Sequence, residues 1–120
     1  MTKKEINSLK RRAKSKWCEV RGSSIHQRGL FATRKIPKET KVIEYVGEKV
    51  DKEESDRRGW AQFEKAQKTG EAGVYIFTLD DEWDVDGSFE WNIARLMNHS
   101  CAPNCEAYID EEAKEIWIWS

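Results

Sequence analysis

Residues 98–105 constrain the fold more than any other part of this sequence. They read NHSCAPNC and mix amide, imidazole, hydroxyl and thiol side chains with a ring-locked proline. Asn, Ser and Pro favour turns and side-chain-to-backbone hydrogen bonds. Regular strands and helices in a protein core rarely contain this mixture of side chains, so the pattern predicts an irregular, polar-lined segment. Such segments carry function more often than packing.

Charge is distributed unevenly along the 120 residues, which suffice for one small domain with one core. The formal net charge is -1, but residues 1–16 carry seven Lys and Arg against one acidic residue, whereas residues 17–120 carry 14 against 21. We expect a basic N-terminal arm (1–16) on an acidic domain (17–120). The arm could bind nucleic acid or an acidic partner, and the domain could bind a basic peptide. Alternatively, both charged surfaces are simply solvated and bind no partner.

The three cysteines, Cys18, Cys101 and Cys105, are odd in number and lack the spacing of a disulfide scaffold. This usage favours a reducing, intracellular compartment. No apolar run approaches the roughly 20 residues of a membrane helix, and no apolar segment follows the basic N-terminus as in a secretory signal. We therefore expect no membrane partner; a bacterial cytoplasm and a eukaryotic nucleus fit equally.

Hydrophobic periodicity and turn residues predict a mostly β chain with little helix. A thin apolar stripe indicates a short basic helix or a frayed arm over residues 3–16, and a charged helical segment over 51–70 ends at Gly70. The remaining pattern favours strands at 41–46 and 74–79, a helical turn at 92–97, and a hairpin of 107–109 with 116–119. Because the last strand has no polar cap, we expect the polypeptide to continue.

Residues 92–105, NIARLMNHSCAPNC, resemble the signature of SET-domain protein-lysine methyltransferases, roughly N-x-A-R-F-x-N-H-S-C-x-P-N-C. Other family motifs have counterparts in the same order: IHQRGLFAT, similar to the glycine loop that wraps S-adenosylmethionine (SAM), then VIEYVGE, YIF and DVDG, at residues 25–33, 42–48, 75–77 and 84–87. Three positions depart from the family: Gln27 and Trp91 replace glycines, and Leu96 replaces an aromatic residue.

The resemblance implies a SET-domain, β-clip-like fold of short twisted sheets with a small helical insert at residues 51–72. It also implies a SAM-dependent protein-lysine N-methyltransferase that acts on a basic, histone-like protein tail. Tyr75 would face the lysine amine, and Tyr45 would form part of the channel wall, as the catalytic pair. The cofactor contacts carried over are Arg28, Gly29, Leu30, Arg95, Asn98 and His99.

The implied reaction is attack of a neutral lysine amine on the methyl group of SAM. Free lysine has a pKa of about 10.4, so the ammonium must first lose a proton. A dry channel and a neighbouring sulfonium both disfavour the charged amine. Aromatic walls shield the alkyl stem, and phenol and carbonyl groups orient the nitrogen.

The family has a later segment, with a motif like E-L-x-x-D-Y, that supplies the principal catalytic Tyr and forms a pseudoknot. No residue here corresponds to it, so we expect a C-terminally incomplete domain without the pseudoknot segment. Family members also use a Cys at the position of Cys105 as one zinc ligand. Because a structural zinc site needs four ligands, we expect no metal in this chain and zinc only in a longer parent.

Two alternatives remain open on the sequence. One is a non-catalytic SET-like module that binds basic peptides, and the other is nucleic-acid binding through the basic arm. At the level of residues, Tyr45 and Tyr75 could be ordinary strand aromatics and His99 a structural histidine. Cys101 is interpreted as a small buried hydrophobe rather than a reactive thiol.

Overall fold

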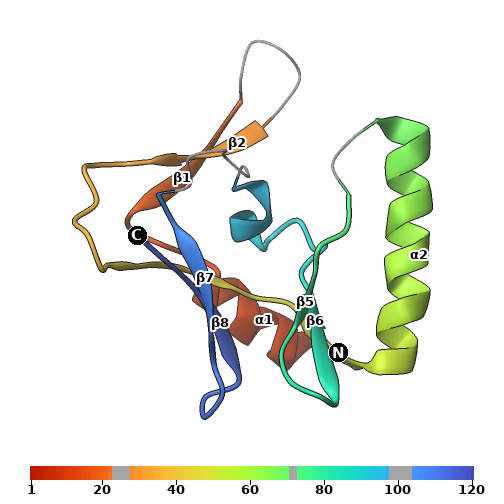
Figure 1. Ribbon diagram of the computed structural model, residues 1–120. Helices are drawn as coiled ribbons and strands as arrows, with labels where there is room; N and C mark the ends of the chain where they lie inside the picture. The colour runs from red at the N-terminus through yellow and green to blue at the C-terminus, as the bar shows by residue number, and fades with distance from the viewer. Residues whose placement is uncertain (23–27, 71–72, 98–103) are drawn as a thin grey trace.

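The computed structural model describes residues 1–22, 28–70, 73–97 and 104–120 (Figure 1). Three small antiparallel sheets lie beside two α-helices and one 3-10 helix in this part of the chain. The elements are, in chain order, α1 (Lys3–Arg12), β1 (Cys18–Gly22), β2 (Arg28–Ala32), β3 (Lys41–Tyr45), β4 (Glu48–Asp51), α2 (Lys52–Thr69), β5 (Ile76–Thr78), β6 (Trp83–Asp86), η1 (Ile93–Leu96), β7 (Glu106–Asp110) and β8 (Glu115–Trp119).

The sheets have the strand orders β1-β2, β3-β8-β7 and β4-β6-β5. β3 pairs with β8 although 69 residues lie between the two strands in the chain, so this ladder brings the two ends of the domain together. β5 pairs with β6, and β6 pairs with β4, which follows β3 almost directly. The expected mostly β fold of short sheets with a helical insert is confirmed.

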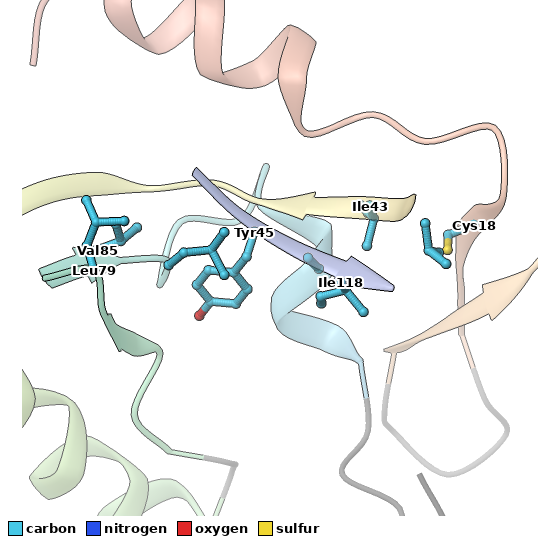
Figure 2. Close-up of a cluster of buried hydrophobic side chains, with 9 residues drawn as sticks. Cys18, Ile43, Tyr45, Leu79, Val85 and Ile118 are labelled. Carbon is cyan, nitrogen blue, oxygen red and sulfur yellow. The ribbon is translucent and has the colours of Figure 1, made fainter. Parts of the chain in front are cut away.

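The core is a single cluster to which all three sheets contribute (Figure 2). Cys18 comes from β1, Ile43 and Tyr45 from β3, Val85 from β6 and Ile118 from β8. Burial of an aliphatic or aromatic side chain of this size stabilises a fold by about 1.5–3 kcal/mol. The cluster therefore fixes the relative placement of sheets that share no hydrogen-bonded ladder.

Helix α1 begins at an N-cap, Thr2, whose side chain accepts a hydrogen bond from the backbone N–H of Glu5. Near its other end, Arg12 forms an ion pair with Glu44, a β3 carboxylate that is only 3% exposed. Burial raises the pKa of Glu44, and the Arg12 hydrogen bond acts in the opposite direction. Of the two sequence readings, the helix is the one observed.

Helix α2 lies along the β4-β6-β5 sheet and contacts β4 and β6 (Figure 1). Asp51 caps its N-terminus, and Gly70 ends it with a φ of 72°, a left-handed conformation that glycine adopts without strain. Inside the helix, the buried Ser55 donates to Asp84 of β6 at 2.5 Å, and Lys52 pairs with the same carboxylate. The predicted charged helix with its stop at Gly70 is therefore confirmed.

Candidate functional site

The backbone of Tyr75 is held at both of its polar groups. Its N–H donates to Gln62 Oε1 of α2 at 2.9 Å. Its carbonyl accepts the Tyr45 hydroxyl at 2.8 Å and the backbone N–H of Gly87 at 2.8 Å. Tyr75 directly precedes β5, so helix α2, strand β3 and the turn after β6 all converge on this one residue.

Tyr45 is a core residue that is 5% exposed, and its hydroxyl contacts the site through the hydrogen bond to the Tyr75 carbonyl. Its ring lies 4.5 Å from the Phe77 ring, centroid to centroid, and it sits within the core cluster (Figure 2). Burial raises the pKa of the Tyr45 phenol, with the nearby Asp86 carboxylate as a smaller cause. The phenol is therefore a neutral donor that orients the Tyr75 carbonyl.

Asn92, the first residue of the signature, is fully buried and joins two elements. Its Oδ1 accepts from the backbone N–H of Val46 at 3.2 Å, and its Nδ2 donates to the Gly87 carbonyl at 2.9 Å. A Cβ on Gly87 would lie 2.3 Å from the Tyr45 ring and 2.5 Å from Asn92 Nδ2. Glycine is needed here because the ring and the amide occupy the space of a side chain.

Arg95, from the 3-10 helix η1, stands beside the Tyr75 ring. Its guanidinium carbon lies 5.3 Å from the ring centroid, within cation–π range, and its Nε donates to the Phe89 carbonyl at 3.2 Å. η1 also packs against β2, the strand that contains Gly29 and Leu30. The structure thus brings together both catalytic candidates and the described cofactor candidates of β2 and η1.

A polar network of α2 side chains holds Tyr75 and the neighbouring strands in place. Gln62 Nε2 donates to Asp86 at 3.0 Å, so one amide bridges Tyr75 and Asp86. Arg58 pairs with the same Asp86, with Glu48 of β4 and with Glu54. These carboxylates, above all Glu48, raise the pKa of the Arg58 guanidinium further, so it stays charged.

Sequence reasoning missed Gln62. The helix was expected, but nothing in its charged pattern indicates which polar side chain faces β5, because that depends on how α2 rotates against the sheet. Asn92 and Gly87 belong to the predicted motifs, and their hydrogen-bonding role follows only from the fold.

Several predicted residues lie outside the described part of the chain or at its edge. Asn98, His99 and Cys101 are outside it, so their predicted roles stay predictions. Arg28 lies in β2. Cys105 is half-buried just before β7, and burial raises its pKa. Its role as a zinc ligand in a longer polypeptide also stays a prediction.

Within residues 1–22, 28–70, 73–97 and 104–120, no group of three or more His, Cys, Asp or Glu side chains is placed to hold a metal ion. In the same segments, neither α-helix is long and apolar enough to cross a membrane.

A family comparison agrees with this geometry. The family model described as "SET domain" matches residues 27–120, which is most of the chain and includes β2, Tyr75 and η1. The chain therefore belongs to the SET-domain family.

Curated relatives add detail about size and similarity. A "Histone-lysine N-methyltransferase, H3 lysine-4 specific" of Mycosarcoma maydis is 42% identical over 82% of the chain, and one of Chaetomium globosum is 39% identical over 96%. A "Histone-lysine N-methyltransferase trr" of Drosophila melanogaster is 40% identical over 80% of the chain. The chain spans only 6%, 10% and 4% of these proteins, respectively.

Proposed function

We propose that this chain carries the SAM-binding junction and the lysine-facing wall of the catalytic site of a SAM-dependent protein-lysine N-methyltransferase. One observation carries the proposal: β2 packs against η1, and Arg95 of η1 lies over the Tyr75 ring. The two segments that resemble the family's SAM motifs thus meet beside the Tyr that resembles its lysine-facing residue. An intracellular setting is part of the proposal, consistent with cysteines that lack a disulfide pattern.

The residues present fit SAM at this junction. Gly29 and Leu30 lie in β2, the strand that packs against η1. Leu30 also packs against the core, and the Arg95 cation matches a carboxylate such as that of the methionine moiety. We assign SAM binding to Arg28, Gly29, Leu30 and Arg95, together with Asn98 and His99. When bound, SAM would supply an electrophilic methyl group on a sulfonium.

The role of the protein is to hold the lysine amine in position. The bonds to both backbone groups of Tyr75 hold the backbone position from which its ring projects, and the Arg95 guanidinium lies against the ring. A positioned wall favours in-line approach of the amine. Arg95 beside the ring disfavours a second cation there, which favours the neutral form of an incoming amine. Tyr45 contributes by holding Tyr75.

The substrate in this proposal is a lysine on a basic, histone-like tail. Residues 17–120 carry 21 acidic against 14 basic side chains, a balance that attracts basic peptides. The curated relatives are named for action on histone lysine, and two of those above specifically for H3 lysine-4.

The test is methyl transfer from labelled SAM to a basic peptide that contains one lysine. We expect label in the peptide and none when that lysine is replaced by arginine. Tyr75→Phe tests the phenol with the ring retained, and we expect it to lower kcat more than KM for the peptide. Peptide binding without methyl transfer, also in a polypeptide extended by a C-terminal segment with the E-L-x-x-D-Y motif, would support the non-catalytic module instead.

A further inference from the structure

Five basic side chains form a second feature of the molecule, separate from the site around Tyr75. All five are exposed, and they lie on the two segments that flank the β1-β2 hairpin. We call this the basic surface; it consists of Lys14, Lys16, Arg34, Lys35 and Lys38.

Hydrogen bonds bring the two segments side by side. The backbone N–H of Thr33 donates to the Trp17 carbonyl at 2.9 Å, and the Thr33 hydroxyl donates to the Lys16 carbonyl at 2.6 Å. The Lys16 ammonium and the Arg34 guanidinium both lie against the Trp17 ring, 5.0 Å and 5.7 Å from its centroid. Because Trp17 also packs against the core, it anchors cations from both segments at one place.

Among the described residues, the side chains of the basic surface have no carboxylate partners. None of its five side chains lies within 4.0 Å of a carboxylate oxygen in the described part of the chain. In contrast, Lys52, Arg57, Arg58 and Lys114 all form ion pairs. These five charges are therefore available to an external anion.

The charge of the whole chain is also divided unevenly, with the positive charge in the part that contains the basic surface. Residues 1–49 carry 14 Lys and Arg against 5 Asp and Glu, a formal +9, whereas residues 50–120 carry 7 against 17, a formal -10. The two halves thus present opposite charge to their partners, and the basic surface belongs wholly to the positive half.

We propose that the basic surface binds the phosphate backbone of duplex nucleic acid. Cations spread over two adjacent segments match a partner whose negative charges repeat regularly, and such contacts are independent of sequence. Resting on the proposed function, this makes the substrate class a basic protein bound to nucleic acid: the basic surface holds the nucleic acid, and the acidic part of the chain faces the lysine-bearing peptide.

The test is fluorescence anisotropy with a labelled 20-base-pair DNA duplex of mixed sequence across a series of KCl concentrations. The variant is Arg34→Glu/Lys35→Glu, and the matched control is Lys65→Glu/Lys68→Glu, two exposed lysines of α2. Both double variants change the net charge equally, so they separate a local surface from overall charge. Thermal unfolding of each variant confirms that it is folded.

We expect the wild-type affinity to fall steeply with salt and Arg34→Glu/Lys35→Glu to bind at least about tenfold more weakly. Its salt slope should be shallower by about 2, since each phosphate contact contributes about 0.9. The control should stay close to wild type. Equal loss in both variants, absence of salt-dependent binding, or equal competition by polyglutamate of the same total charge would overturn the proposal.

Methyl transfer to a free peptide separates this inference from the proposed function. Arg34→Glu/Lys35→Glu should retain that activity while losing duplex binding, because neither residue lies in the site around Tyr75.

Discussion

The β4-β6-β5 and β3-β8-β7 sheets are alike in size and direction but differ in how their edge strands are secured. β5 begins beside Tyr75, whose backbone is bound by side chains from α2 and β3. In β7, by contrast, every residue is exposed, and Tyr108 and Ile109 are 54% and 42% exposed. Polar side-chain bonds thus fix the place where chemistry is proposed, while β7 depends chiefly on its ladder with β8.

This difference between the two edge strands indicates that the structure is preorganised around Tyr75. Three groups, from helix α2, strand β3 and the turn after β6, hold the Tyr75 backbone, and their loss should propagate to the ring. Substitutions along β7 should have small consequences because few side chains lose contacts there. The following changes test that contrast, from the largest expected effect to the smallest.

Gly87→Ala should be the most damaging change. The added methyl would lie 2.3 Å from the Tyr45 ring and 2.5 Å from Asn92, two buried groups that have no free space. Overpacking of this kind costs about 3 kcal/mol. Urea unfolding measures the loss, with Gly73→Ala as the control because a Cβ there meets nothing within 4 Å. Equal stability of the two variants would break the contrast.

Gln62→Ala should follow, at about 2 kcal/mol, because it removes two hydrogen bonds and leaves the Tyr75 N–H and Asp86 without this partner. Hydrogen exchange of the Tyr75 amide should accelerate in the same variant. Gln67→Ala, at an exposed position of the same helix, serves as the control and should change neither quantity. Unchanged exchange at Tyr75 would show that Gln62 does not secure this backbone.

The same substitution at two isoleucines of the other sheet sharpens the comparison. Ile116→Val, at a position of β8 that is 1% exposed, should cost about 1 kcal/mol. Ile109→Val, in β7, should cost less than about 0.5 kcal/mol because this side chain is exposed rather than packed in the core. Thermal unfolding of the pair decides the point; a larger loss at Ile109 would mean that β7 is packed more tightly than its exposure indicates.

The smallest effect concerns an exposed ion pair between the two sheets. Lys114, at the β7-β8 turn, lies 3.0 Å from Asp80 and, with backbone N–H groups, lowers the pKa of that carboxyl to about 2. The folded pKa is below the unfolded value of about 3.9, so the stabilisation is present above about pH 4 and is lost as the pH falls towards 2. Lys114→Ala should therefore make Tm less dependent on pH in that window. An unchanged slope would show that the pair contributes nothing.

Much of the fold followed from local pattern. The left-handed stop at Gly70, the strand from residue 41 and the final hairpin are set by nearby residues, and all three are observed. Strand β4 was not predicted, because a single buried residue, Val50, stands among charged neighbours. β3 also ends one residue earlier than expected, since the Val46 N–H donates to Asn92 instead of continuing a ladder.

The site was harder to predict from local sequence pattern than the fold was. Tyr75 and Arg95 were identified by family resemblance, and the structure places them within cation–π range. Gln62, in contrast, acts through residues 13 and 24 positions away in the chain, and such bonds depend on tertiary packing rather than on sequence spacing.

The most direct test of the central claim is thermal unfolding of the chain with and without excess SAM, for the wild type and for Arg95→Met. The account predicts an upward shift of several degrees for the wild type, since ligand at 100 times Kd adds about 2.7 kcal/mol, and a much smaller shift for Arg95→Met. A wild-type transition that SAM leaves unmoved, or an equal shift in both proteins, would contradict the assignment of a SAM site to the junction of β2 and η1.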